Sequence, residues 1–80
     1  MIPPRIKSVR PLNKFHLEII YETNEKKIYD MDYLLEMDCY KKLRDVNYFN
    51  KVKSVETTVE WPDGEDVDPN ELYENSLIVN

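Results

Sequence analysis

Alternating apolar and polar positions predict β-structure in the first part of the chain. Residues 15–22 carry apolar side chains at every second position, so one face of a strand would hold Phe15, Leu17, Ile19 and Tyr21. Residues 23–25 are typical of a tight turn, and residues 26–30 then return as the antiparallel partner. A weaker pattern, built on Ile6, Val9 and Leu12, predicts an earlier strand that ends at Pro11.

The pattern changes in the middle of the chain, where aspartates precede short apolar stretches. An aspartate before a helical turn accepts hydrogen bonds from its free amides, so Asp32, Asp38 and Asp45 are expected N-caps. None of these stretches is long enough to be stable as a helix alone. We expect two or three short helical turns that cover the sheet with Leu34, Leu35, Leu43 and Phe49.

The last third begins with a second alternating segment. Residues 52–61 are predicted to be β-structure, with Val55, Thr57, Val59 and Trp61 on one face. Because Trp61 stands at the end of this strand, we expect a core side chain whose indole N–H reaches water or a carbonyl. The Pro62-Asp63-Gly64 sequence predicts a turn after it.

A helix start follows this turn. Asp68 is the expected N-cap, Pro69 takes the first helical position, and Glu71 would complete a capping box. The helix is expected to run to about Ser76, and an apolar tail of residues 77–79 follows. Together the elements predict a single α+β domain over residues 1–80, with a small antiparallel sheet of three to five short strands and short helices packed on one face.

Composition favours a soluble, cytoplasmic protein. Hydrophobic residues make up 41% of the 80 residues, well above the level of disordered segments. Cys39 is the only cysteine, whereas small secreted domains are usually held together by disulfides. The amino terminus has no apolar stretch like that of a signal peptide, and no apolar run is long enough for a membrane span.

Charge is distributed unevenly. The net charge is −5, yet all eleven Lys and Arg residues lie at or before Lys53. Residues 54–80 carry eight Asp and Glu residues and therefore a net charge of −8. Such a segment suits a basic partner and repels a phosphate backbone.

The order of these segments resembles the DUF2442 family, a family of small bacterial domains of unknown function. The most specific part is the Trp61-Pro62-Asp63-Gly64 turn, followed by Asp66 and the Leu72-Tyr73 pair. The resemblance implies a small α+β fold with an antiparallel sheet. It also implies a gene context that looks like a toxin–antitoxin pair, with some members fused to a helix-turn-helix domain. It supplies no catalytic residue.

Candidate chemistry in the acidic segment is mostly explained by architecture. The spacing does not fit a calcium loop of the EF-hand type, because Gly64 comes too early and Pro69 interrupts the loop. Turn and cap roles account for Asp63, Gly64, Asp68 and Glu71. Glu65 and Asp66 are left without a structural role, so we expect partner binding at Glu65 and Asp66, with Asp63 beside them.

Signals for catalysis are weak. His16 is expected to be a solvated side chain on the outer face of the sheet, and Cys39 a small buried hydrophobic residue rather than a reactive thiol. A chain with one glycine has no phosphate-binding glycine loop. We therefore expect no enzyme activity, no cofactor and no metal.

Two functional hypotheses follow. The first is a non-enzymatic interaction module, the antitoxin-like or accessory member of a two-gene pair, which binds a small basic protein through its acidic C-terminal surface. The alternative is a regulator that contacts nucleic acid through the basic stretch Lys41–Lys53, with Lys41, Lys42 and Arg44 as the expected contacts. This alternative includes a homodimer joined through an exposed edge strand or the tail 77–79.

Overall fold

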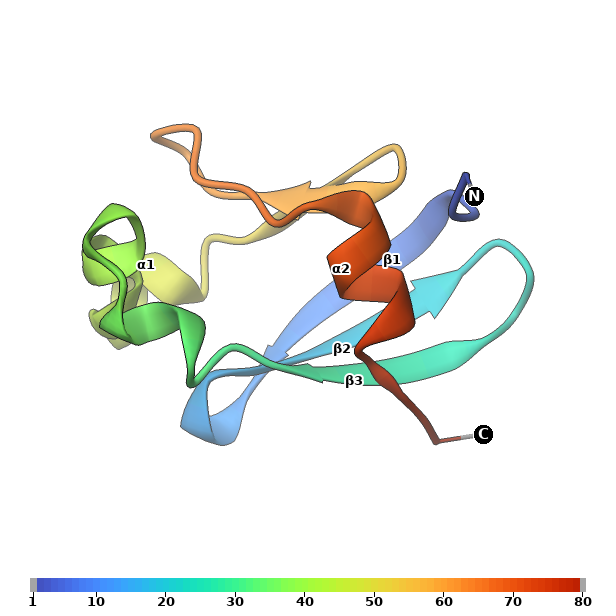
Figure 1. The fold of residues 1–80 in the computed structure, drawn as a ribbon, viewed down its shortest axis with the longest axis horizontal. Coiled ribbons are helices and arrows are strands. Elements are labelled where there is room, and N and C mark those ends of the chain that lie inside the picture. Colours follow the sequence, from blue (N-terminus) through green and yellow to red (C-terminus); the bar gives the residue numbers. More distant parts are fainter. Residues whose placement is uncertain (1, 80) are drawn as a thin grey trace.

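The computed structural model describes residues 2–79, which form an α+β fold with two antiparallel sheets (Figure 1). The larger sheet has the strand order β1-β2-β3-β6 and the smaller one is the hairpin β4-β5. The strands are β1 (Ile6–Leu12), β2 (His16–Tyr21), β3 (Lys26–Asp30), β4 (Lys53–Val55), β5 (Thr58–Glu60) and β6 (Leu77–Ile78). The helical turns are η1 (Asn13–Phe15), η2 (Leu34–Glu36), η3 (Asp38–Arg44), α1 (Val46–Phe49) and α2 (Pro69–Glu74). The predicted fold class is therefore confirmed.

The β2–β3 hairpin forms as its alternation predicts. Leu17, Ile19 and Tyr21 have no exposed surface, because they share the inner face of the sheet. The turn between the strands places Asn24 in the left-handed region, with a φ of 73°. Asparagine tolerates this region better than most residues, so the local sequence and the turn agree.

Two expectations at the start of the sheet are wrong. Strand β1 continues through Pro11, which pairs with Leu17. Proline is tolerated here because β1 is an edge strand. Only one side of β1 pairs with another strand, so a residue that faces the other side needs no N–H for the sheet. Strand β2 begins at His16 because Lys14 and Phe15 both have a φ of 59° and turn the chain. The Phe15 ring instead packs edge-on against Phe49, with ring centroids 5.2 Å apart.

The expected caps of the middle segment are only partly correct. Asp45 accepts a hydrogen bond from the Asn47 N–H at 2.9 Å and caps α1, as predicted. Asp32 and Asp38 do not cap a helix: η2 follows Tyr33 and η3 follows Met37, neither with a side-chain cap bond. Tyr33, just before η2, already has helical backbone angles, and Asp38 is itself the first residue of η3, so neither aspartate occupies an N-cap position. Those apolar side chains are buried as expected, namely Leu34, Leu35, Leu43 and Phe49.

Residues 52–61 form a hairpin, β4–β5, and not one continuous strand. Glu56 has a φ of 52° and reverses the chain between the two strands. Its carbonyl accepts a hydrogen bond from the Ile6 N–H at 2.7 Å, which joins the hairpin turn to β1. This tertiary contact is absent from the alternation pattern, so the sequence did not predict the turn. Val59 and Trp61 are fully buried, as expected.

Of the two capping residues predicted for helix α2, Asp68 caps the helix and Glu71 does not. The Asp68 carboxylate accepts from the Asn70 N–H at 3.0 Å, and Pro69 occupies the first turn. The capping box does not form, because Glu71 bonds with Tyr29, Tyr33 and Asn75 instead. The helix ends at Glu74, and the apolar tail after it forms β6.

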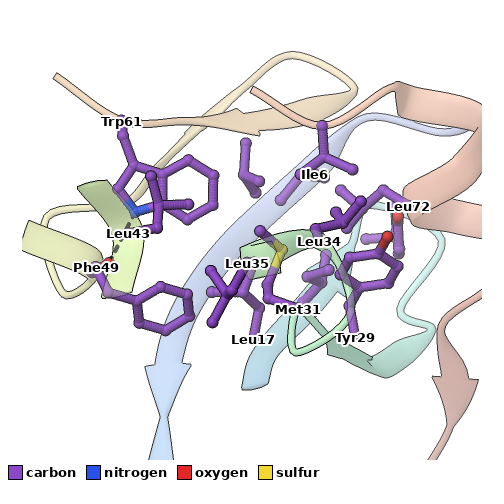
Figure 2. Close-up of a cluster of buried hydrophobic side chains, with 14 residues drawn as sticks. Ile6, Leu17, Tyr29, Met31, Leu34, Leu35, Leu43, Phe49, Trp61 and Leu72 are labelled. Carbon is purple, nitrogen blue, oxygen red and sulfur yellow. Dashed lines mark hydrogen bonds between the residues drawn. The ribbon is translucent and has the colours of Figure 1, made fainter. Parts of the chain in front are cut away.

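One core lies between the inner face of the larger sheet and the elements packed on that face (Figure 1). Trp61 and Phe49 lie at one end of the core and Leu72 at the other (Figure 2). The Trp61 indole N–H donates to the Phe49 carbonyl at 2.9 Å, as the position of Trp61 at a strand end predicted. The opposite face of the sheet carries ion pairs of Glu18 with Arg10 and Lys26.

Candidate functional site

The turn after Trp61 lies against the basic segment of η3 and α1. Lys42 forms an ion pair with Asp63. The Tyr48 hydroxyl accepts from the Asp63 N–H at 2.9 Å and donates to the Glu65 carboxylate at 2.6 Å. The acidic and basic candidate surfaces, far apart in the sequence, are therefore neighbours in the structure.

Tyr48 is the side chain that joins these two segments. Burial, with a contribution from the hydrogen bond to Glu65, raises the pKa of Tyr48 to about 12. The hydroxyl therefore keeps its proton at physiological pH and can donate and accept at once. The Lys42 ammonium also lies 5.2 Å from the centroid of the Tyr48 ring, within cation–π range.

Glu65 has a structural role, so the interpretation that it has none is wrong. Its carboxylate is half-buried and accepts from Tyr48, and its carbonyl accepts from the Trp61 N–H at 2.8 Å. The carboxylate of Asp66 differs, because Asp66 is exposed and no ion pair involving it occurs among residues 2–79. The Asp66 backbone is nevertheless fixed, since its carbonyl accepts from the Tyr40 hydroxyl at 2.7 Å.

The segment from residue 61 to residue 68, called here the acidic loop, is held at both ends and in its middle. The Gly64 N–H donates to the Trp61 carbonyl at 2.9 Å, and Gly64 has a φ of 98°, a value that suits glycine. Thr58 donates to the Val67 carbonyl near the far end. The loop therefore presents the exposed carboxylates of Asp63, Asp66 and Asp68 from a fixed backbone.

The three candidate nucleic-acid contacts all interact with their own chain. Lys42 pairs with Asp63, and Lys41 lies 3.8 Å from Asp38. The Arg44 Nε donates to the Leu35 carbonyl at 2.7 Å. A phosphate would have to compete with the two carboxylates, so this segment is a weaker anion site than its composition indicates.

A second group of tyrosines, which the sequence did not single out, holds α2. Tyr29 donates to Glu71 at 3.0 Å, and Tyr33 and Asn75 donate to the same carboxyl group. These bonds, first that from Tyr33, lower the pKa of Glu71 against the opposing effect of burial. The only sequence signal was the presence of six tyrosines beside many carboxylates; the pairs depend on the tertiary fold.

Residues weighed for catalysis are not assembled into a reactive group. The Nδ1 of His16 lies 3.1 Å from the Lys14 carbonyl, and its Nε2 lies 3.7 Å from the Asp30 carboxylate. Cys39 is exposed, so the expectation of a buried cysteine is wrong. Within residues 2–79 no group of three or more His, Cys, Asp or Glu side chains could hold a metal ion.

Three hollows share Phe15 in their lining. One of about 380 Å³ is lined by apolar side chains, among them Leu12, Val46 and Phe49, and by the polar residues Asn13, Lys14 and Asn50. The other two also border Phe15, one with His16 and Asp32 and the other with Asp32 and Arg44. They contain none of the predicted partner-binding residues.

Comparison with known proteins identifies a family. The model of the family described as "Protein of unknown function (DUF2442)" matches residues 6–77. The chain belongs to this family. The DUF2442 match starts at the first residue of β1 and reaches β6, so it includes the whole acidic loop. No curated protein and no solved structure matches the chain significantly. None of the helices within residues 2–79 has the length and apolar character needed to cross a membrane.

Proposed function

We propose that this DUF2442 chain is a non-enzymatic interaction module that binds a small basic protein through its acidic C-terminal surface. The acidic loop would make the central contact, with Asp66 as its main residue and with Asp63 and Glu65 beside it. A role as the antitoxin-like or accessory member of a two-gene pair, in the cytoplasm, is part of this proposal. That part rests on the gene context that the resemblance to the DUF2442 family implies.

The observation that carries the proposal is the fixed backbone of the acidic loop. Tyr48 and Tyr40 hold it from outside, and the Trp61 N–H holds it from within. A loop ordered before binding loses less conformational entropy on association, so its charges can contribute fully to affinity. No lysine or arginine occurs after Lys53, and Lys42 pairs with Asp63, so within residues 2–79 the carboxylates of Glu65 and Asp66 keep their negative charge without an ion pair.

Charge and contacts favour this function over nucleic-acid binding. Lys41 and Lys42 each pair with an aspartate, and Lys42 lies directly beside the acidic loop. A phosphate backbone approaching these lysines would meet Asp63 and Glu65, and like charges at an interface oppose association. A basic protein surface would meet Lys41 and Lys42 where they already pair with Asp38 and Asp63, and it would find Asp66 exposed and without an ion pair among residues 2–79.

The test uses the product of the neighbouring gene, co-expressed with the chain and purified with it. We expect a complex whose affinity falls at least tenfold with Asp66→Lys and falls further with added salt. Glu36→Lys is the matched control, since Glu36 is also exposed but lies in η2, outside the loop. It should leave the affinity unchanged.

Two results would contradict the proposal. One is the absence of any complex when both proteins are folded. The other is a salt-dependent shift of DNA or RNA that is lost when Lys41 and Lys42 are both changed to glutamine, which would support the alternative function.

A further inference from the structure

Strand β6 is an apolar strand at the edge of the larger sheet. Leu77, Ile78 and Val79 are exposed to 73%, 61% and 50%, and they follow one another in the chain. The strand pairs with β3 on one side, through Lys27 with Ile78 and Ile28 with Leu77. Edge strands with exposed apolar side chains are the usual sites of pairing with another chain.

The hydrogen bonds of β6 show which backbone groups face outward. The Val79 N–H donates to the Lys26 carbonyl of β3 at 2.9 Å. In an antiparallel strand the backbone groups of successive residues point to opposite sides. The N–H and C=O of Ile78 therefore point away from β3, towards the open edge.

The other edge of the sheet is protected. At the start of β1 the Ile6 N–H is bonded to Glu56 of the β4–β5 turn, and Arg5 lies 4.0 Å from the same glutamate. Towards its end β1 contains Pro11, which has no N–H to donate. The sheet is therefore open for pairing at Ile78 of β6, whereas β1 is blocked at both of its ends.

We propose that β6 binds β6 of a second copy of this chain, antiparallel and about a twofold axis at Ile78. The inference does not depend on the proposed function of the acidic loop. Pairing of the β6 edge with itself gives a closed dimer, because each copy uses the same edge and that edge is then occupied in both. The two four-stranded sheets would join into one sheet of eight strands.

Side chains and charge fit this pairing. In this register Ile78 lies opposite its counterpart and Leu77 lies opposite Val79 of the second copy, beside Ile28. Three consecutive uncharged residues form the contact, so two molecules of net charge −5 can meet there without placing like charges opposite each other. The neighbouring cations are already engaged, since Lys26 pairs with Glu18 and Lys27 lies on the Tyr73 ring. The contact is much smaller than a standard interface, so we expect a reversible, concentration-dependent dimer.

Sedimentation equilibrium of the chain from micromolar to millimolar concentration tests this proposal. We expect the mass to rise from that of the monomer towards twice that value. Ile78→Pro should weaken dimerisation at least tenfold, because it removes the outward N–H but not the bond between Val79 and Lys26. Ile78→Lys should have a similar effect through charge repulsion, and it covers the case in which the proline variant does not fold. Val46→Lys is the control, since Val46 is 57% exposed but lies in α1.

Amide exchange gives a second readout that distinguishes β6 from other contacts. Exchange at Ile78 should slow as concentration rises, whereas exchange at Val79 should change little. A monomer at every concentration would overturn the proposal. So would a dimer that both Ile78 variants leave intact, because another surface would then hold the two copies together.

Discussion

At the scale of single residues, Trp61 combines packing with a specific hydrogen bond. Its ring has no exposed surface and lies 5.8 Å from the Phe49 ring, centroid to centroid. Its N–H satisfies the Phe49 carbonyl. The residue therefore fixes the end of α1 relative to the end of β5, and so fixes the place where the acidic loop begins.

Trp61→Phe tests this double role. The smaller ring leaves a cavity and the Phe49 carbonyl loses its donor, so we expect a loss of about 2 kcal/mol in the free energy of unfolding. Urea denaturation followed by circular dichroism measures it. Val46→Ala, at an exposed site, should change stability by less than about 0.5 kcal/mol. Equal effects of the two substitutions would contradict the role given to Trp61.

At the scale of elements, the difference between Asp68 and Asp38 shows what a sequence motif can predict. Both aspartates precede apolar residues and both were expected to be caps. Asp68 is followed by Pro69, whose fixed φ favours a helix start at that position, and the cap forms. Asp38 lacks such a neighbour, and η3 starts one residue earlier than a cap at Asp38 requires.

Alanine substitution of each aspartate measures this difference. Asp68→Ala should cost about 1 kcal/mol of stability, because the Asn70 N–H loses its acceptor at the start of α2. Asp38→Ala should cost much less, since the structure shows no cap bond from Asp38 and only an exposed contact with Lys41. The urea midpoints of the two variants, compared with that of the wild type, measure both losses. A larger loss for Asp38→Ala than for Asp68→Ala would contradict the cap role given to Asp68.

Local signals explain which elements were predictable. The β2–β3 hairpin, the turn at Gly64 and the start of α2 each depend on residues close together in the chain, and all three were predicted. The reversal at Glu56 depends on its bond to Ile6, fifty residues away, and was missed. The same limit applies to the candidate site: its charges were visible in the sequence, but the bonds from Tyr48 and Tyr40 that order the acidic loop were not.

At the scale of the whole molecule, tyrosine hydroxyls connect the acidic C-terminal segment to the rest of the fold. Tyr40 and Tyr48 hold the acidic loop, and Tyr29 and Tyr33 hold α2 through Glu71. In the opposite direction Tyr73 donates to Glu25 at 2.7 Å, next to β3. Each tyrosine must be protonated to donate its hydrogen bond. The glutamates that accept from Tyr29, Tyr33, Tyr48 and Tyr73 accept most strongly when their carboxyl groups are ionised. Stability should therefore depend on pH at both ends of the scale.

The acid limit follows from Glu71, whose pKa in the folded protein is lowered from an ordinary value of 4.5, chiefly by the Tyr33 hydroxyl. A lowered folded pKa stabilises the protein above the unfolded pKa, and this contribution is lost as pH falls below about 4.5. Glu71→Gln should therefore make the urea midpoint less dependent on pH between pH 5 and pH 3, measured at about ten pH values. Glu74→Gln, on the exposed side of the same helix, is the control and should keep the wild-type slope.

At alkaline pH stability is limited by the tyrosines, whose pKa values are raised where that of Glu71 is lowered. Burial raises the pKa of Tyr29 and of Tyr21 above the ordinary value of 10.0, and the hydrogen bond to Glu25 raises that of Tyr73. A raised folded pKa leaves stability intact below the unfolded pKa and removes it as pH rises past that value. We expect tyrosinate absorbance to appear above pH 10 together with loss of the circular dichroism of the fold, in one transition. Tyrosinate that formed at an ordinary pKa in a molecule that stayed folded would show that the hydroxyls do not hold the C-terminal segment.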